Sequence, residues 1–260
     1  MHSQISPISA IVITFNEEAN ISRCLKSLDF ADEIVVVDSF SADQTLAIAQ
    51  AHGAKVMQQK FLGHVEQKNF ATRQASHDWI LSLDADEEIS PELRKSILSA
   101  RTEGLRADAY SVNRRSYYLT DWFMQGGWYP DRKIRLFNRT RACWTGRNPH
   151  DHVRIEPGAR VVHLRGDLLH YPYHDLSDHL ERIQSYSIIA ARGKAGKRVT
   201  SLHLIGHPAA KFLKAYLLKG AILQGTRGLI FSVMAALSVF MKYAKLWELR
   251  NCASDGPERH

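Results

Sequence analysis

The chain has 260 residues, of which 45% are hydrophobic and 23% charged, so it can bury a large core and is not a disordered segment. Three cysteines, Cys24, Cys143 and Cys252, have no C-x-x-C spacing and an odd count, which argues against a disulfide framework and a zinc site. The N-terminus lacks the basic segment of a secretory signal, so we expect a cytoplasmic protein.

The net charge of +7 is divided unevenly along the chain. Residues 1–100 hold 8 Lys or Arg against 14 Asp or Glu, whereas the rest of the chain holds 26 against 13. From Arg192 to Arg250 there are 11 basic residues and one acid, Glu248, among many large apolar side chains. This mixture favours an anionic membrane surface over nucleic acid, for which small polar residues would usually separate the basic ones.

Strands and helices alternate over the first ~90 residues, as in a doubly wound nucleotide-binding half. Apolar runs predict strands, and apolar residues at helical spacing predict the helices between them. The expected strands are 8–15, 33–38, 55–58 and 79–83, and the expected helices are 21–28, 41–52 and 67–73, with Ser41 and Gln44 as a capping box. Neither G-x-G-x-x-G nor G-x-x-x-x-G-K-[ST] occurs, which disfavours a dinucleotide oxidoreductase and a P-loop NTPase.

Four carboxylates follow the apolar run 79–83 within five positions: Asp84, Asp86, Glu87 and Glu88. In an open α/β sheet, ligands bind in the crevice beyond the carboxyl ends of the strands. Carboxylates so close together repel one another unless a cation neutralises them, and Mg²⁺ or Mn²⁺ prefers such hard oxygen ligands. The alternative is a solvated acidic turn before the helix that begins near Ser90.

Further strands are expected at 110–114 and 133–137, with a helix at 90–101 between the acids and the first of them. The aromatic, glycine-containing loop 117–130 suits a sugar-binding wall or a membrane-facing lip, with core packing as the alternative. Additional strands are expected at 159–163 and 167–171, followed by a helix capped by Ser177.

The tail from about residue 199 onward combines basic and apolar residues. Its purest apolar run, Leu229 to Met241, is shorter than the ~20 residues that span a bilayer. We therefore expect an amphipathic helical pair that lies on the membrane, with a core-packed helical subdomain as the alternative. The predicted domains are 1–198 and a membrane-associating segment, 199–260.

Three groups of residues at strand ends resemble the motifs of family 2 glycosyltransferases, which have the GT-A fold. They are residues 11–18, residues 35–39 with Asp43 and Thr45, and residues 83–87. The later residues 128–130, 135–137 and His150-Asp151 are similar in particular to lipopolysaccharide-core glucosyltransferases of the WaaE/KdtX type. The resemblance implies a Rossmann-like mixed sheet flanked by helices, with the C-terminal helices as an appendage.

The resemblance also assigns roles to individual residues. It places Asp38 at the nucleotide base, Thr14, Asn16 and Glu17 around it, and Asp84 at the ribose. Lys68 resembles a cation at the base or phosphate, although a solvated position on a helix surface would explain it equally well. Asp86 corresponds to the metal ligand for Mg²⁺ or Mn²⁺. His170 is a candidate further ligand, with a hydrogen-bonded core histidine as the alternative.

Asp151 corresponds to the general base, where the family usually has Glu. The implied reaction is an inverting transfer of a hexose, with glucose from a UDP-sugar expected, to a lipid-linked saccharide such as the lipopolysaccharide inner core. The expected location is the cytoplasmic face of the membrane, as a peripheral protein. Two alternatives remain at this point: a peripheral binding protein on an inactive scaffold, and a transferase for another cell-envelope glycan. A phosphatase with a D-x-D-x-T nucleophile is disfavoured, because Glu88 occupies the position of the Thr.

Overall fold

The computed structural model describes residues 6–147, 150–193 and 198–251, and it separates the chain into two compact units. The first unit comprises Met1–Arg115 and Pro130–Tyr171, and the second comprises Ser116–Tyr129 and Pro172–His260. The sequence-based boundary between the two domains, at residues 198 and 199, differs from this division and stays a prediction.

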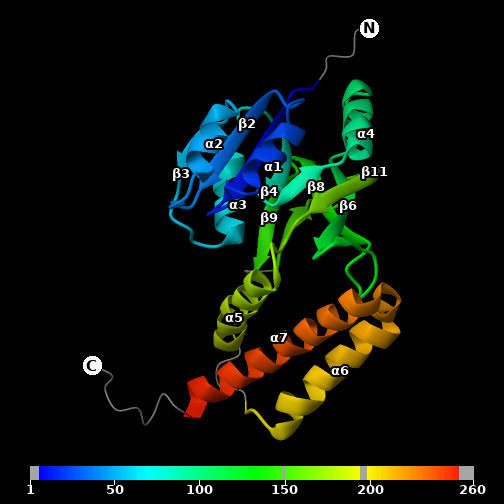
Figure 1. The fold of residues 1–260 in the computed structure, drawn as a ribbon. Helices are drawn as coiled ribbons and strands as arrows, with labels where there is room; N and C mark the ends of the chain where they lie inside the picture. The colour runs from blue at the N-terminus through cyan, green and yellow to red at the C-terminus, as the bar shows by residue number, and fades with distance from the viewer. Residues whose placement is uncertain (1–5, 148–149, 194–197, 252–260) are drawn as a thin grey trace, which may run out of the picture. The chain divides into compact units, whose positions relative to one another are not determined.

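A mixed β-sheet forms the centre of the first unit (Figure 1). The strand order is β3-β2-β1-β4-β8-β6-β11-β5. The first four strands in this order run parallel to one another. Strand β8 runs antiparallel to both β4 and β6. The strands are β1 (Ile8–Thr14), β2 (Glu33–Asp38), β3 (Lys55–Gln58), β4 (Trp79–Asp84), β5 (Glu87–Ile89), β6 (Ala109–Tyr118), β8 (Asp131–Asn138) and β11 (Val161–His170). A separate antiparallel pair consists of β9 (Ala142–Arg147) and β10 (His150–Ile155).

Two apolar clusters cover the two faces of this sheet. One joins it to α1 (Ile21–Ser27), α2 (Thr45–Ala51) and α4 (Pro91–Thr102), and the other joins it to α3 (His64–Gln74) and the β9–β10 pair. Because β1, β2 and β4 are buried on both sides, their sequences are nearly continuous apolar runs. The sheet predicted from those runs is confirmed.

Three sequence-based details are wrong. The helix expected from 41 begins at Thr45, because the hydroxyl of Ser41 bonds to Asp38 and to the backbone of Asn16 instead of capping. The strands expected at 159–163 and 167–171 are one strand, β11. The helix after it is capped by Asp175, whose carboxylate accepts from the backbone N–H of Asp178 at 2.8 Å, and not by Ser177.

Gly166 explains how β11 continues through the position where two strands were expected. Its φ is +90°, and a Cβ there would lie 2.3 Å from the backbone nitrogen of Leu93 in α4. Only glycine lets the strand and the helix approach so closely.

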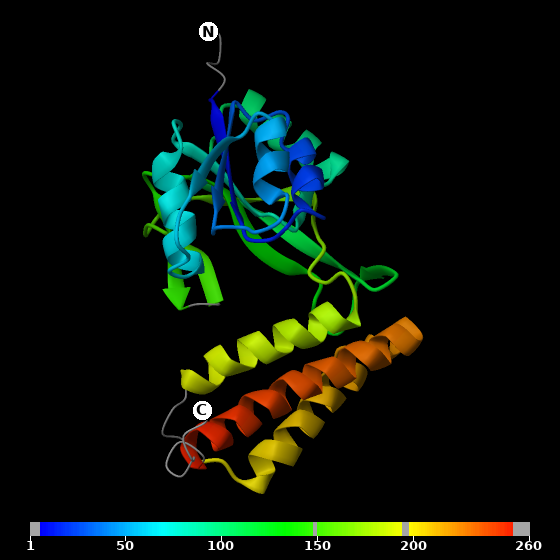
Figure 2. The ribbon, with the colours of Figure 1, turned by 60° about the vertical axis from the view of Figure 1, so that its left-hand side comes forward.

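The second unit is mainly helical, with α5 (Leu176–Arg192) and α6 (His207–Leu213) both packed along α7 (Gly225–Asn251) (Figures 1 and 2). Short π-helical turns, η1 (Leu202–Gly206) and η2 (Lys214–Leu218), flank α6, and a 3₁₀ turn, η3 (Ala221–Gln224), precedes α7. The loop around β7 (Asp121–Phe123) packs its aromatic rings on Phe231 of α7. Core packing is therefore the correct alternative for Tyr118 and Phe123, which are fully buried.

One helical stretch, Ala221–Asn251, is long and apolar enough to cross a membrane by length and composition alone. The sequence-based argument against a span counted only the run from Leu229 to Met241 and so underestimated the apolar length. Of the cysteines, Cys24 and Cys143 are free thiols, and Cys252 lies outside the described residues, as does the segment 1–5 on which the signal-peptide argument rests.

Candidate active site

The ends of three parallel strands bring the first group of predicted residues together. Thr14 is paired with Asp38 in the register of β1 and β2, and Ile13 is paired with Asp84 in the register of β1 and β4. Thr14, Asp38 and Asp84 therefore lie at one edge of the sheet. This is the edge at which open α/β sheets bind ligands.

Asn16 holds the loop after β1 to the loop after β2. Its backbone N–H donates to the hydroxyl of Ser41 at 2.8 Å, and its side-chain oxygen accepts from the backbone N–H of Ala42 at 2.8 Å. The backbone N–H of Glu17 donates to the hydroxyl of Thr45 at 2.8 Å. Asn16 has a φ of +52°, a conformation that asparagine tolerates better than most residues. These bonds fix the loop before any ligand arrives.

Asp38 is buried and contributes to the same loop structure. One of its oxygens accepts from the backbone N–H of Ser41 at 2.9 Å and from the side-chain amide of Gln58 at 3.3 Å. The hydroxyl of Thr14 beside it is also buried and has no hydrogen-bond partner among the described residues. An unpaired buried hydroxyl at this edge favours a ligand group that would bond to it.

Lys68 joins two of the predicted site residues. Its ammonium lies 3.0 Å from Oδ1 of Asp84 and 2.8 Å from Oδ2 of Asp151, and 4.4 Å from the centroid of the Trp144 indole. Lys68 is only 3% exposed, so the alternative of a solvated lysine on a helix surface is wrong. The ion pairs bring Asp151, on β10, to the end of β4.

Arg135 reaches the same carboxylate from the other side. Its Nη2 lies 3.2 Å from Oδ2 of Asp84 and 2.5 Å from Oε1 of Glu87. The other oxygen of Glu87 accepts from the backbone N–H of Asp84 at 3.0 Å. Burial alone would raise the pKa of Asp84, but Lys68 and Arg135 outweigh burial and hold that pKa well below its usual range.

A β-bulge turns Arg135 towards the site. Tyr110 is paired with Leu136, but the next residue, Ser111, is paired with Ile134, so Arg135 has no partner across the ladder. Bulges of this kind re-aim a side chain and are common next to active sites. The sequence analysis included Glu87 in the acidic cluster and Arg135 in the motif 135–137 but gave neither residue a role, although a single Arg within the apolar run Ile134–Phe137 was a usable signal.

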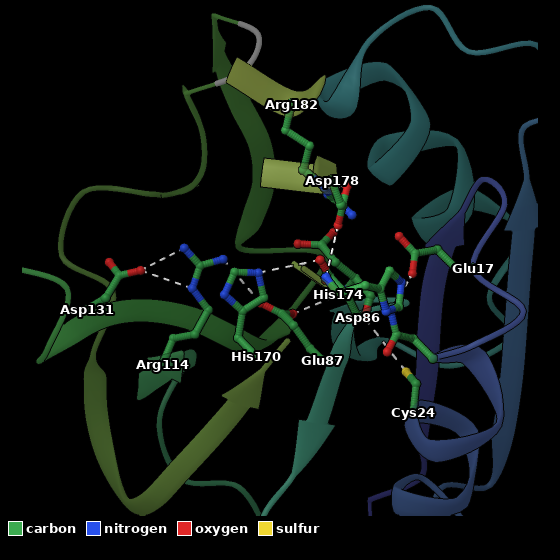
Figure 3. A network of polar contacts seen from close by, with 12 residues as sticks. Glu17, Cys24, Asp86, Glu87, Arg114, Asp131, His170, His174, Asp178 and Arg182 are labelled. Atoms are coloured by element: carbon green, nitrogen blue, oxygen red, sulfur yellow. Dashed lines mark hydrogen bonds and ion pairs between the residues drawn. The ribbon is translucent and has the colours of Figure 1, made fainter. Parts of the chain in front are cut away.

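Arg114 completes this network of charged groups. Its Nε and Nη2 lie 3.0 and 2.8 Å from Oδ2 of Asp131, and its Nη1 lies 3.4 Å from Oε1 of Glu87 (Figure 3). Glu87, which is 1% exposed, is therefore held by two arginines. This pairing keeps the turn between β4 and β5 in place.

Asp86 and His170 meet at that turn, since His170 ends β11 and is paired with Glu87 of β5. Nε2 of His170 lies 3.5 Å from Oδ2 of Asp86 (Figure 3). Among the described residues, no group of three or more His, Cys, Asp or Glu side chains could hold a metal ion. The chain therefore offers two neighbouring donors, which fit Mg²⁺ or Mn²⁺ only if substrate phosphates and water complete the ligand shell.

A cavity of about 520 Å³ in the first unit contains three of the predicted residues, Lys68, Asp84 and Asp151. The remaining lining residues are Arg114, Arg132, Lys133, Ile134, Arg135, Trp144, His152 and Val153. Two buried donors of the lining, Nε of Arg135 and Nε1 of Trp144, have no hydrogen-bond partner among the described residues. A basic, donor-rich wall around two carboxylates suits an anionic, oxygen-rich substrate.

Comparison with known proteins identifies the family. The sequence model of "Glycosyl transferase family 2" matches residues 9–159. The chain belongs to glycosyltransferase family 2. Its mixed sheet with flanking helices is the GT-A fold, and the protein is a glycosyltransferase.

Relatives match nearly the whole chain. "Uncharacterized glycosyltransferase RT0209" of Rickettsia typhi is 33% identical, covering 93% of this chain and 87% of the relative. The "Lipopolysaccharide core biosynthesis glycosyltransferase LpsC" of Rhizobium meliloti is 30% identical, covering 93% of this chain and 92% of LpsC. Among solved structures, the mannosyltransferase PcManGT of Pyrobaculum calidifontis, in complex with GDP-Man and Mn²⁺, superposes with a TM-score of 0.55 at 15% identity, covering 95% of this chain and 89% of PcManGT.

Proposed function

We propose that this glycosyltransferase inverts the anomeric carbon as it moves a hexose from a nucleotide-diphosphate sugar to a lipid-linked saccharide such as the lipopolysaccharide inner core. The name of LpsC, a relative along nearly its full length, supports the lipopolysaccharide core as the acceptor class. The bound GDP-Man of PcManGT supports a nucleotide-sugar donor. UDP as the nucleotide and glucose as the sugar rest on the resemblance of residues 128–130, 135–137 and His150-Asp151 to lipopolysaccharide-core glucosyltransferases.

The observation that carries the proposal is the lysine bridge between Asp84 and Asp151. In an inverting displacement, the acceptor hydroxyl attacks the anomeric carbon while a base removes its proton. Asp151 is the proposed base, and Lys68 holds it within the cavity that also contains Asp84. A carboxylate has two oxygens, so contact between Lys68 and Oδ2 is compatible with proton transfer to the other oxygen.

The donor would lie along the strand ends. We place its base and ribose against Thr14, Asn16, Glu17, Asp38 and Asp84, and its diphosphate near Lys68. Asp86 and His170 would hold Mg²⁺ or Mn²⁺, whose charge would stabilise the departing diphosphate. The unpaired hydroxyl of Thr14 is one group in this region that a ligand would satisfy.

We also propose that the second unit binds the cytoplasmic face of the membrane peripherally. Its described helices expose large apolar side chains close in sequence to lysines. The exposed residues include Leu202, Ile205, Leu213, Leu217, Leu218 and Leu223, and the lysines are Lys211, Lys214 and Lys219. A helix that spans the bilayer, Ala221–Asn251, is the competing arrangement.

Transfer assays test the enzymatic proposal. The full chain would be incubated with UDP-, GDP- and ADP-hexoses, with Mg²⁺, Mn²⁺ or EDTA, and with truncated lipopolysaccharides or other envelope glycolipids as acceptors. We expect metal-dependent transfer from a UDP-hexose to a lipopolysaccharide core, with the opposite anomeric configuration in the product by NMR. Transfer only to another glycolipid would identify a different envelope pathway, and no turnover with any donor would support an inactive scaffold.

Carbonate extraction tests the membrane proposal. Alkaline carbonate releases peripheral proteins from native membranes and leaves spanning proteins behind. Release of the full chain would support a peripheral position, whereas retention would show that the stretch Ala221–Asn251 spans the bilayer.

A further inference from the structure

A second cavity adjoins the proposed catalytic one. It measures about 450 Å³ and is lined by Ser111, Val161 and His163, together with Arg132, Lys133 and Ile134. The last three residues also line the cavity that contains Asp151. All of these residues belong to the first unit, and they come from β8, β6 and β11, which are neighbours in the sheet. The two cavities therefore share a wall, formed by β8.

Arg132 differs from the neighbouring cations Lys133 and Arg114 in having no carboxylate partner within the part of the chain that the structure describes. Lys133 is paired with Asp131 at 3.1 Å, and Arg114 is paired with Asp131 and Glu87. Arg132 is exposed, and no carboxylate among the described residues lies within ion-pair distance of it. Its guanidinium is therefore available to an anionic group of a ligand.

The order of strands places Arg132 away from the proposed nucleotide site. Asp38 and Thr14 end β2 and β1, Asp84 ends β4, and Arg132 lies on the next strand, β8, where it is paired with Asn113 of β6. The second cavity continues in the same direction, across β6 to β11. A group bound there would lie on the side of the site that is opposite to the nucleotide base.

We propose that the acceptor carries a phosphate or carboxylate that Arg132 binds, and that the acceptor saccharide extends from Asp151 along the second cavity past Ser111 and His163. The planar guanidinium matches both oxyanions through paired N–H donors. A cavity of this size suits part of a saccharide better than a single ion. The inference rests on the proposed function, because it assumes that Asp151 receives the acceptor's proton.

Direct binding of small probes tests this subsite without requiring turnover. The probes are methyl glucoside, its 6-phosphate and methyl glucuronide, which differ in the charge at one position. Their affinities for the full-length protein would be measured by ligand-observed NMR with UDP at saturation, so that a phosphate cannot simply occupy the donor site. We expect at least one charged probe to bind about tenfold more tightly than methyl glucoside, as for a charge-assisted hydrogen bond.

Three variants assign the preference to a residue. Arg132→Ala should reduce the advantage of the charged probe to below about threefold and leave UDP affinity unchanged, and Arg132→Lys should restore it in part. Arg165→Ala is the matched control, because Arg165 is an exposed arginine on β11 that lines neither cavity. It should behave like the wild type.

Each possible result bears on the inference. A phosphate-only or carboxylate-only preference that depends on Arg132 supports it and identifies the anion. Equal affinity for all three probes, or a preference that survives in Arg132→Ala, overturns it. A parallel loss of UDP affinity in Arg132→Ala also overturns it, since Arg132 would then bind the donor. If the wild type does not bind UDP at all, the proposed function fails, and the probes measured without UDP still test Arg132 separately.

Discussion

The two units depart from the usual distribution of residues in opposite ways. In the first unit, charged side chains are buried: Lys68 and Arg135 are 3% exposed, and Glu87 is 1% exposed. In the second unit, large apolar side chains are exposed, and Leu218 and Leu223 are 82% and 77% exposed. Buried charges are stable only when paired, and clusters of exposed apolar residues are uncommon in soluble monomers.

This contrast shows where folding alone does not explain the sequence. A hydrophobic replacement would pack the interior of the first unit at least as stably as the network of Lys68, Arg135, Glu87 and Asp84. Polar side chains at the surface of the second unit would interact with water more favourably than its exposed leucines do. The chemistry of a charged substrate would explain the first departure, and an apolar partner such as a membrane would explain the second.

The largest effect is expected at the proposed base. Asp151→Asn should lower kcat by about 10²–10⁴-fold, because the amide cannot accept the proton, and leave UDP affinity unchanged, because Asp84 still pairs with Lys68. Asp151→Glu should retain part of the activity, since the family usually has Glu at this position. Asp108→Asn, outside the cavity lining, is the control. An equal loss of donor affinity in Asp151→Asn would assign this residue to the donor site.

Breaking the buried network should cost stability. Arg135→Met leaves Glu87 and Asp84 without one of their cations, and we expect the free energy of unfolding to fall by about 3–5 kcal/mol in urea titrations. Arg94→Met, which removes the ion pair of Arg94 with Asp29 at the surface of the same unit, should cost less than about 1 kcal/mol. Equal losses of unfolding free energy in the two variants would show that the buried ion pairs contribute no more to stability than an exposed one.

Asp86→Asn should separate activity from folding. We expect turnover of the donor to fall by about 100-fold or more across a Mn²⁺ titration, while the melting temperature stays close to that of the wild type. Asp78→Asn, before β4, is the control with a mainly exposed carboxylate. Near-wild-type turnover of Asp86→Asn at saturating Mn²⁺ would rule out the assigned metal ligand.

The second unit should respond to acid through His179. This residue is buried between Tyr118 and Tyr173, and burial lowers its pKa from 6.5 to about 4. The unfolded chain then binds the proton more readily than the folded one, so His179 costs no stability above pH ~6.5, and the cost grows as pH falls to about 4. The full cost is about 3 kcal/mol.

Tryptophan fluorescence during urea unfolding at pH 7.5 and pH 4 would measure the difference. In His179→Gln, the loss of stability between these two pH values should be smaller than in the wild type by up to that amount. The same loss in both proteins would mean that other groups control the acid response.

The fold was largely predictable because its signals are local. Buried parallel strands are continuous apolar runs, and β1, β2 and β4 were located from them. The convergence of Thr14, Asp38 and Asp84 followed from the common edge of parallel strands. Ser41 is an exception, because a hydroxyl that could cap a helix can bond equally well to a neighbouring loop.

The charged network was not predictable, because its partners are distant in sequence. Lys68 and Asp151 are 83 residues apart, and helical periodicity gave no indication that Lys68 is buried. The re-aiming of Arg135 depends on a bulge in the pairing of β6 with β8, which neither strand shows alone. The catalytic and binding roles of all these residues stay predictions until variants are measured.

The smallest effects should appear at single exposed leucines of the second unit. Leu218→Ser and Leu223→Ser remove apolar surface that is already in solvent, so stability should change by less than about 0.5 kcal/mol. If these side chains insert into a bilayer, each change should weaken binding to anionic vesicles by about 1–2 kcal/mol, or roughly 5- to 30-fold.

Flotation with anionic vesicles over a salt series separates this apolar contribution from that of the lysines. Salt should weaken the binding of every variant, because Lys211, Lys214 and Lys219 act through screened charges. The leucine effect should persist at high salt, since it does not depend on charge. Leu62→Ser is the matched control, a leucine 66% exposed in the first unit, and it should float like the wild type. Unchanged flotation of Leu218→Ser and Leu223→Ser would mean that these leucines do not contact the membrane, and the contrast between the two units would then need another apolar partner to explain it.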